Sequence, residues 1–272
     1  MRRSALASLP VAAPRFMPPP TLSVIVITKN EAAHIEACLK SVAFADESIV
    51  VDSGSSDATP TLAASMGARV VRTDDWPGFG AQKNRALALA RGDWVLSVDA
   101  DERVGDELAA EIRAVVQRND SAGPTGYELN RLSSFCGQWM RHGDWYPDRV
   151  LRLFRRGAGR FSDDLVHERL LVDGDCARLN GELLHFTMPT LEDAIDKMNR
   201  YTTGRAIDKV RAGRRGGLAP ALTHGLWAFV RCYALRRGFL DGRLGLILAL
   251  YVAEGTYYRY LKMSWRPQSG SD

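Results

Sequence analysis

Apolar runs with strand-like and helix-like spacing alternate along the first part of the chain. The run LSVIVIT at 22–28 is apolar and β-branched, which predicts a buried strand, and helical spacing follows it at 31–43. Further strands are expected to begin at residues 47, 68 and 94, with further helices at 60–67, 79–92 and 106–118. This alternation is typical of an α/β fold with a mostly parallel sheet flanked by helices.

The pattern changes after residue 118. It weakens between 120 and 190, where we expect short strands and loops. Helical spacing returns at 191–213, and two apolar, aromatic stretches with basic flanks follow at 217–238 and 244–265. The resulting division is a leader (1–20), a domain (21–200) with halves 21–118 and 119–200, and a C-terminal helical extension (201–272).

The leader and the cysteines bear on where the protein works. Residues 1–20 contain three consecutive prolines and no continuous apolar stretch, so a disordered leader is expected, with a poor signal peptide as the alternative. The composition, 46% hydrophobic and 25% charged, is that of a globular protein. The four cysteines form no CxxC pair, so we interpret them as reduced thiols of a cytoplasmic protein rather than zinc ligands.

Positive charge gathers at the C-terminal end. Residues 205–266 contain twelve lysines and arginines but three acids, which predicts an anionic partner, either a membrane or a nucleic acid. The longest uncharged apolar run there, 244–253, has ten residues, whereas about 20 are needed to span a bilayer. Aromatic residues flanked by arginines favour helices in an anionic membrane interface, with a helical pair packed on the core as the alternative.

Polar residues follow three of the predicted strands. TKNE follows the first strand, DSGSSD the second and DADE the fourth. Right-handed crossovers bring the carboxyl ends of parallel strands to one edge of the sheet, where open α/β sheets bind ligands. The chain has neither GxxxxGK[ST] nor a GxGxxG after its first strand, which argues against a P-loop and a dinucleotide site.

The DADE segment at 99–102 carries the most chemical information. In an extended segment Asp99 and Asp101 point the same way, while Ala100 turns to the sheet. Two carboxylates leave positions open on a hard cation such as Mg²⁺ or Mn²⁺, and a diphosphate can fill them. Alternation turns Glu102 away, which leaves it a supporting or capping role. The alternative is that these residues are solvated turn acids or a helix start.

Together these motifs resemble family 2 glycosyltransferases, which are inverting, nucleotide-sugar-dependent enzymes of the GT-A fold. The resemblance rests on SVIVITKNEAAHIEACLKSV, IVVDSGSSDATPTLA, QKNRALALARGDWVLSVDADERV and VHERL. It covers about residues 21–200 and is strongest to glucosyltransferases of lipopolysaccharide core assembly. It implies a nucleotide-binding half (21–118), an acceptor half (119–200) and Mg²⁺ or Mn²⁺. It also implies a UDP-sugar donor with glucose as the sugar, and with galactose or N-acetylglucosamine as the alternatives.

The resemblance also assigns residues to the donor site. They are Thr28, Asn30, Glu31, Asp52, Ser53, Gly54, Asp57, Lys83 and Asp99. Asp52 is expected to accept a hydrogen bond from uracil N3–H. Lys83 is expected near the nucleotide or its phosphates, with a solvated helix lysine as the alternative. Asp101 is expected to bind the metal directly, with Asp99 in the metal shell and His167 as a further ligand or an orienting group.

An inverting transfer needs a base opposite the leaving diphosphate. We assign Glu168 to this role, with Asp163 and Asp164 in reserve. A second set, expected to bind acceptor or phosphate unless it forms a basic surface strand, is Asp148, Arg149 and Arg152.

The basic extension suits an acceptor that is anchored in a membrane. We expect a lipid-linked glycan such as the lipopolysaccharide inner core, and an enzyme held peripherally on the cytoplasmic face of the membrane. The alternatives are another envelope polysaccharide, a polyprenyl-phosphate acceptor, or a nucleotide- or nucleic-acid-binding protein that uses the basic extension.

Overall fold

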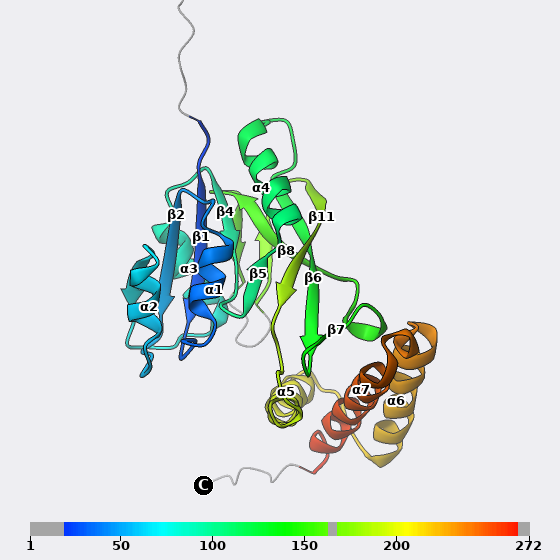
Figure 1. Ribbon diagram of the computed structural model, residues 1–272. Coiled ribbons are helices and arrows are strands. Elements are labelled where there is room, and N and C mark those ends of the chain that lie inside the picture. The colour runs from blue at the N-terminus through cyan, green and yellow to red at the C-terminus, as the bar shows by residue number, and fades with distance from the viewer. Residues whose placement is uncertain (1–18, 163–167, 266–272) are drawn as a thin grey trace, which may run out of the picture.

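A computed structural model describes residues 19–162 and 168–265 of the chain. A mixed sheet forms its centre, with helices on both faces and a layer of C-terminal helices at one end (Figure 1). The strands are β1 (Leu22–Thr28), β2 (Glu47–Asp52), β3 (Arg69–Arg72), β4 (Trp94–Ser97), β5 (Glu102–Val104), β6 (Gly126–Phe135), β7 (Gln138–Trp139), β8 (Asp148–Arg155), β9 (Gly159–Phe161), β10 (Leu170–Val172) and β11 (Cys176–His185). The helices are α1 (Ile35–Ser41), α2 (Thr59–Ser65), α3 (Phe79–Leu89), α4 (Asp106–Arg118), η1 (Gly143–Trp145), α5 (Leu191–Arg211), α6 (Leu218–Val230), η2 (Arg231–Leu235), η3 (Gly238–Asp241) and α7 (Gly242–Lys262).

The order of the strands confirms the predicted α/β class. The main sheet runs β3-β2-β1-β4-β8-β6-β11-β5, and β7 pairs with β6. Its first four strands are parallel, so their carboxyl ends share one edge. Beyond β4 the sheet is mixed: β8 is antiparallel to both neighbours, while β11 is parallel to β6. The parallel half carries the predicted nucleotide motifs, and the mixed half extends the sheet beyond β4.

The two faces of the sheet hold separate apolar clusters. On β1, Val24 and Val26 join the cluster that includes α1 and α4, whereas Ile25 joins the cluster under α3. This division follows from the alternation of side chains along a strand. Both faces of β1 are therefore buried, which explains why its sequence is continuously apolar.

Residues 120–190 are more regular than the sequence pattern predicted. They contain two ten-residue strands, β6 and β11, paired in parallel across a register shift between Arg178 and Glu182. The pattern was weak because β6 has buried residues on both faces, among them Asn130, Ser133 and Ser134. Polar residues that are buried by pairing break the apolar alternation that usually identifies a strand.

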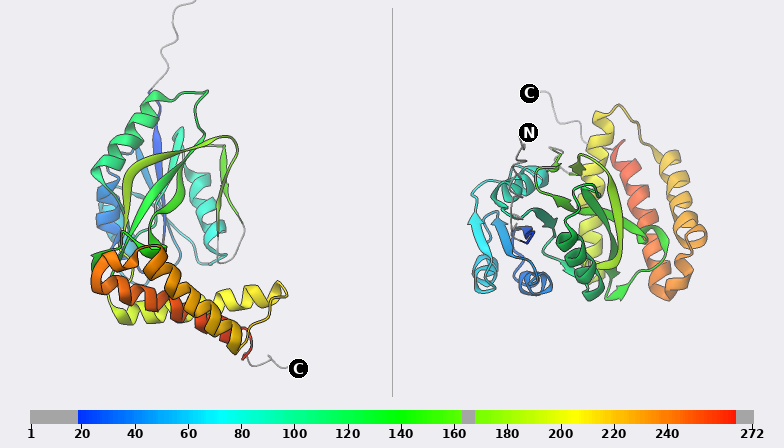
Figure 2. Two further views of the ribbon diagram at one scale, coloured as in Figure 1. Left: turned by 90° about the vertical axis from the view of Figure 1, so that its right-hand side faces the viewer. Right: turned by 90° about the horizontal axis from the view of Figure 1, so that it is seen from above.

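The C-terminal helices form a layer across one end of the sheet (Figure 2). α7 packs on α5 and α6, and Leu248 of α7 joins a cluster with Phe135 and Met140 from the sheet side. Arg231 and Asp144 form an ion pair with an N–O distance of 2.5 Å that ties η2 to η1. The predicted boundary at residue 200 falls inside α5, which is one continuous helix. Within the described residues, no helix is long and apolar enough to cross a membrane.

Candidate active site

The ends of β1 and β2 are joined by a hydrogen-bond network. The Thr28 hydroxyl donates to Asp52 (3.0 Å), and the backbone N–H of Asn30 donates to the Ser55 hydroxyl (2.8 Å). The backbone N–H of Ala32 donates to Asp57 at 3.1 Å. Gly54 has φ +75°, a conformation that side chains with a Cβ rarely adopt. The predicted donor residues of this rim therefore meet as expected from the topology.

Asp52 is fully buried within this network. One carboxylate oxygen accepts from the hydroxyls of Thr28 and Ser55, and the other from the Ser55 backbone N–H (2.9 Å). Both oxygens thus hold the loop after β2 in place. The predicted hydrogen bond to uracil N3–H stays a prediction, and it requires the ligand to reach a carboxylate that already has partners inside the protein.

Asp99 and Asp101 lie just past the end of β4 and line one cavity, as alternation predicted. Ala100 between them is buried in the apolar cluster of the α1 face. Glu102 has the supporting role: its side chain is 0% exposed, and it accepts the backbone N–H of Asp99 at 2.9 Å. Glu102 fixes the turn from inside the protein.

Two cations hold Asp99. Lys83 Nζ lies 3.0 Å from one carboxylate oxygen, and Arg152 Nη2 lies 2.5 Å from the other. Burial raises the pKa of Asp99, but the charges of Arg152 and Lys83 outweigh it and hold this pKa well below the ordinary value. Asp99 is therefore ionised throughout the physiological range, with both oxygens engaged.

Arg152 differs from its predicted role. Its Nη2 contacts both Asp99 and Glu102, the latter at 2.8 Å, and the residue is buried. Because two protein carboxylates neutralise this guanidinium, its contacts do not match the predicted binding of acceptor phosphate. Of the other two residues in that set, Asp148 accepts from Arg131 (2.8 Å) and Arg149 donates to the carbonyl of Leu179 (3.2 Å). Both line the cavity.

Glu168 reaches the site because β9, which pairs with β10, packs against α3. Asn84 exchanges two 2.9 Å hydrogen bonds with the backbone of Phe161, and a Cβ on Gly80 would lie 1.9 Å from the Ser162 carbonyl oxygen. That close approach requires glycine at position 80. Glu168 then accepts from Lys83 Nζ at 2.9 Å, so Lys83 bridges the predicted base and Asp99.

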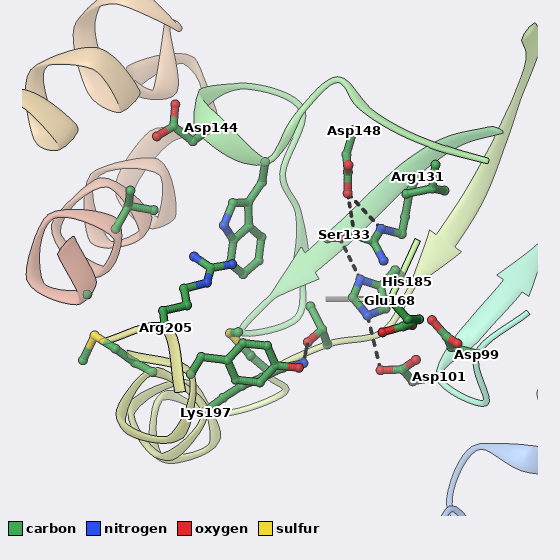
Figure 3. A pocket seen from close by; sticks show the side chains of 18 of the residues that line it. Asp99, Asp101, Arg131, Ser133, Asp144, Asp148, Glu168, His185, Lys197 and Arg205 are labelled. Atoms are coloured by element: carbon green, nitrogen blue, oxygen red, sulfur yellow. Dashed lines mark hydrogen bonds and ion pairs between the residues drawn. The ribbon is translucent and has the colours of Figure 1, made fainter. Parts of the chain in front are cut away.

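His185 is a site residue that the sequence analysis missed. Its Nε2 lies 3.3 Å from Asp101 Oδ2, and its Nδ1 lies 2.9 Å from the Ser133 hydroxyl (Figure 3). Burial raises the pKa of Asp101, but the hydrogen bond and charge of His185 lower it overall. His185 ends β11, where polar residues close a strand as they do in the DADE segment; that signal was present but stood in the weakly patterned region.

Negative charge accumulates around Glu31. Burial and the nearby Asp101, Asp57 and Asp99 raise the pKa of Glu31 to about 7. Burial is the larger cause of this shift, and the three neighbouring carboxylates add to it. A divalent cation is the kind of ligand that such a site favours.

The assignment of Asp101, Asp99 and His167 as metal ligands stays a prediction. Asp101 and His185 present a carboxylate and an imidazole side by side at the cavity, whereas both oxygens of Asp99 are taken by Lys83 and Arg152. Among the residues that the structure describes, no three His, Cys, Asp or Glu side chains form a cluster that could hold a metal ion. A cation at Asp101 and His185 would therefore need further ligands from a substrate. His167, Asp163 and Asp164 lie outside the described residues.

The cavity has a volume of about 1320 Å³ and spans the sheet edge and the C-terminal helices. Of the predicted residues, it is lined by Glu31, Lys83, Asp99, Asp101, Asp148, Arg149, Arg152 and Glu168. Its opposite wall includes Lys197 and Arg205 of α5, which the sequence analysis did not assign to the site (Figure 3). The cavity thus has carboxylates and cations mixed at the sheet end and cations without carboxylates on the helices.

Comparisons with known proteins identify relatives of the chain. The family model described as glycosyl transferase family 2 matches residues 23–153. The lipopolysaccharide core biosynthesis glycosyltransferase LpsC of Rhizobium meliloti is 30% identical over 258 residues, covering 90% of this chain and 95% of LpsC. A glycosyltransferase of Rickettsia bellii is 30% identical over 258 residues, covering 89% of this chain and 85% of that protein.

One solved structure with a partial likeness is glucosyl-3-phosphoglycerate synthase from Mycobacterium tuberculosis, crystallised with Mn²⁺, UDP and glucosyl-3-phosphoglycerate. It is 30% identical, with a TM-score of 0.34, over 42% of this chain and 44% of that one. The two sequence relatives, by contrast, match nearly the whole of both chains. On the strength of those relatives and the family match, the chain is a glycosyltransferase and belongs to glycosyl transferase family 2.

Proposed function

We propose that the protein transfers a sugar, glucose in the first instance, from a UDP-sugar to a lipid-linked glycan such as the lipopolysaccharide inner core, with inversion and with a divalent cation. The observation that carries this proposal is the carboxylate pair Asp99 and Asp101 at the edge of a large cavity, with Lys83 and Glu168 beside it. The name of the relative LpsC supports the choice of acceptor.

Electrostatics supports the need for a cation. A nucleotide diphosphate would have to approach the carboxylates of Asp101, Glu31 and Glu168, which line the same cavity and would repel it. Asp101 and His185 would hold the cation, because their ligating atoms lie 3.3 Å apart and both residues line the cavity. When bound, the cation would stabilise negative charge on the leaving diphosphate.

Glu168 and Lys83 have two further roles in this proposal, one toward the acceptor and one toward the donor. Glu168 would deprotonate the acceptor hydroxyl, as an inverting displacement requires. Lys83 now contacts Glu168 and Asp99, and a donor diphosphate would compete for its ammonium group. The rim formed by Thr28, Asn30 and the loop after β2 would hold the uridine, with Ser53, Gly54 and Asp57 in that loop.

The C-terminal helices would bring the enzyme to a membrane. α6 exposes large apolar side chains, with Leu222 55% exposed and Leu226 66% exposed, beside Trp227. The chain leading into α6 contains Arg214 and Arg215, both exposed. Apolar side chains with adjacent arginines fit the interface of an anionic bilayer. Such an enzyme would work peripherally on the cytoplasmic face, where nucleotide sugars and a lipid-linked acceptor meet.

A donor panel tests this function. Purified protein with Mn²⁺ is mixed with UDP-glucose, UDP-galactose, UDP-N-acetylglucosamine or GDP-mannose, and unfolding is followed by thermal shift. A bound donor raises the melting temperature by mass action, so we expect a shift with a UDP-sugar that EDTA removes. Release of UDP from the donor that binds then tests turnover. A shift with GDP-mannose alone, or one that EDTA leaves unchanged, would contradict the proposal.

A further inference from the structure

Three arginines from separate elements converge on the helical end of the cavity. Arg205 comes from α5, Arg231 from η2 and Arg259 from α7, and all three line the cavity. The lining residues contributed by residues 191–262 include these arginines and Lys197 but no aspartate or glutamate. Every acidic residue of the lining belongs instead to the sheet side or its loops.

The nearest acid, Asp144, neutralises one of the three arginines, Arg231. Asp144 is already shared by Arg231, at 2.5 Å, and by Arg236, at 3.4 Å. Among the described residues, neither Arg205 nor Arg259 has a carboxylate within ion-pair distance, and the buried Nε of Arg259 has no hydrogen-bond partner. Burial lowers the pKa of Arg259, and the charges of Arg205 and Arg231 lower it further against the effect of Tyr260. The lowered pKa of Arg259 thus reflects its burial first and two neighbouring like charges second.

The cluster is separated from the reacting end by a known length of helix. Lys197, Tyr201 and Arg205 are four residues apart along α5, so they lie on one face, and all three line the cavity. Lys197 donates to the Thr187 hydroxyl (2.8 Å). Burial lowers the pKa of Lys197, and the nearby charge of Asp101 acts in the opposite direction. Arg205 lies eight residues further on, which is about 12 Å at the α-helical rise. An acceptor that spans both ends is therefore longer than one sugar residue.

We propose that Arg205 and Arg259, with the paired Arg231 beside them, form a subsite for an anionic group, a phosphate or carboxylate, carried by the acceptor away from the hydroxyl that receives the sugar. Guanidinium groups recognise both anions through charge-assisted hydrogen bonds. Tyr201, Trp145 and Tyr251 line the intervening wall, where aromatic faces can pack against sugar rings. That the anion belongs to a glycosyl acceptor rests on the proposed function, whereas the anion-binding site itself does not.

A binding experiment tests the subsite without glycosyl transfer. Glucose 6-phosphate is titrated into the full chain by calorimetry, using wild type, Arg205→Ala, Arg205→Ala/Arg259→Gln, and the control Arg211→Ala, an exposed α5 arginine outside the cavity lining. We expect wild type and the control to bind alike, and the double variant to bind about tenfold more weakly or worse. UDP–Mn²⁺ affinity should stay unchanged in all four proteins, because the donor end of the cavity is intact.

Two further measurements make the outcome decisive. Without ligand, the melting temperature of Arg205→Ala should equal or exceed that of wild type, since the substitution removes like-charge repulsion and no ion pair. Phosphatidylglycerol vesicles distinguish a lipid headgroup from a glycan anion: we expect all four proteins to bind vesicles equally. Equal glucose 6-phosphate binding by wild type and the double variant, or none by wild type, would overturn the subsite. Loss of vesicle binding alone in the double variant would assign the cluster to lipid instead. Failure of UDP binding in wild type would count against the proposed function and leave the anion site standing.

Discussion

At the scale of single residues, Asp99 and Asp101 are close in sequence yet differ in environment. Asp99 is held by Lys83 and Arg152, whereas Asp101 faces the cavity beside His185. The sequence predicted that the two carboxylates point the same way, because that follows from local alternation. It did not predict His185 at Asp101 or Arg152 at Asp99, because these contacts depend on how β8 and β11 pair within the sheet.

Replacing Glu168 with glutamine tests the assigned base. The amide keeps the shape of the side chain but cannot take a proton, so we expect kcat to fall by about 100-fold to 10,000-fold. The donor affinity should change little, since Glu168 is assigned to the acceptor hydroxyl. Steady-state kinetics of UDP release with a membrane-extract acceptor, together with UDP–Mn²⁺ calorimetry, separates the two quantities. Unchanged kcat would move the base to another residue.

Glu31 predicts a pH dependence of stability. Its pKa is about 7 in the folded protein, above the ordinary carboxyl value, so the folded state holds a proton that the unfolded state has released. The free energy of unfolding therefore falls as pH rises from about 5 to about 7. Glu31→Gln removes this loss, so in EDTA the variant should melt a few degrees higher than wild type at pH 8 and near it at pH 5. Melting curves with parallel pH dependence would contradict the raised pKa.

At the scale of elements, local sequence patterns predicted helices, whereas features that depend on long-range pairing were not predictable. The helices at 79–92 and 106–118 were predictable, because their spacing and terminal residues are local signals, and they correspond to α3 and α4. The length of β6 was not predictable, because polar residues such as Asn130 are buried through tertiary contacts. The position of Glu168 depends on the same kind of contact, since Ser162, just after β9, must lie against Gly80 of α3.

The exposed face of α6 predicts a membrane-binding defect. Leu222→Ser/Leu226→Ser removes two exposed apolar side chains, each worth about 1.5–3 kcal/mol when buried in an apolar phase. We expect co-sedimentation with anionic vesicles to weaken by at least about tenfold, while the melting temperature stays near wild type. Met66→Ser, at an exposed position on the distant α2–β3 turn, is the matched control and should sediment normally. Equal sedimentation of all three proteins would refute the interfacial role of α6.

At the scale of the whole molecule, one cavity joins two chemically different ends. The parallel half of the sheet contributes acids such as Glu31, Asp99 and Asp101 to the lining, and the C-terminal helices contribute arginines and aromatic side chains. Charge counting along the sequence predicted a basic extension but placed its charge at a membrane. The structure turns part of that charge, including Arg205 and Arg259, toward the site, because α5 and α7 pack across the end of the sheet.

The most direct test of this account is the Mn²⁺-dependent release of UDP from UDP-glucose by three proteins: wild type, Asp101→Asn and the control Asp208→Asn, an exposed aspartate on α5. Wild type and the control should turn over equally and only with the cation. Asp101→Asn should lose at least about 100-fold in rate with an unchanged melting temperature, because a bound cation contributes several kcal/mol of transition-state stabilisation. Wild-type turnover by Asp101→Asn, or turnover in EDTA, would contradict the account.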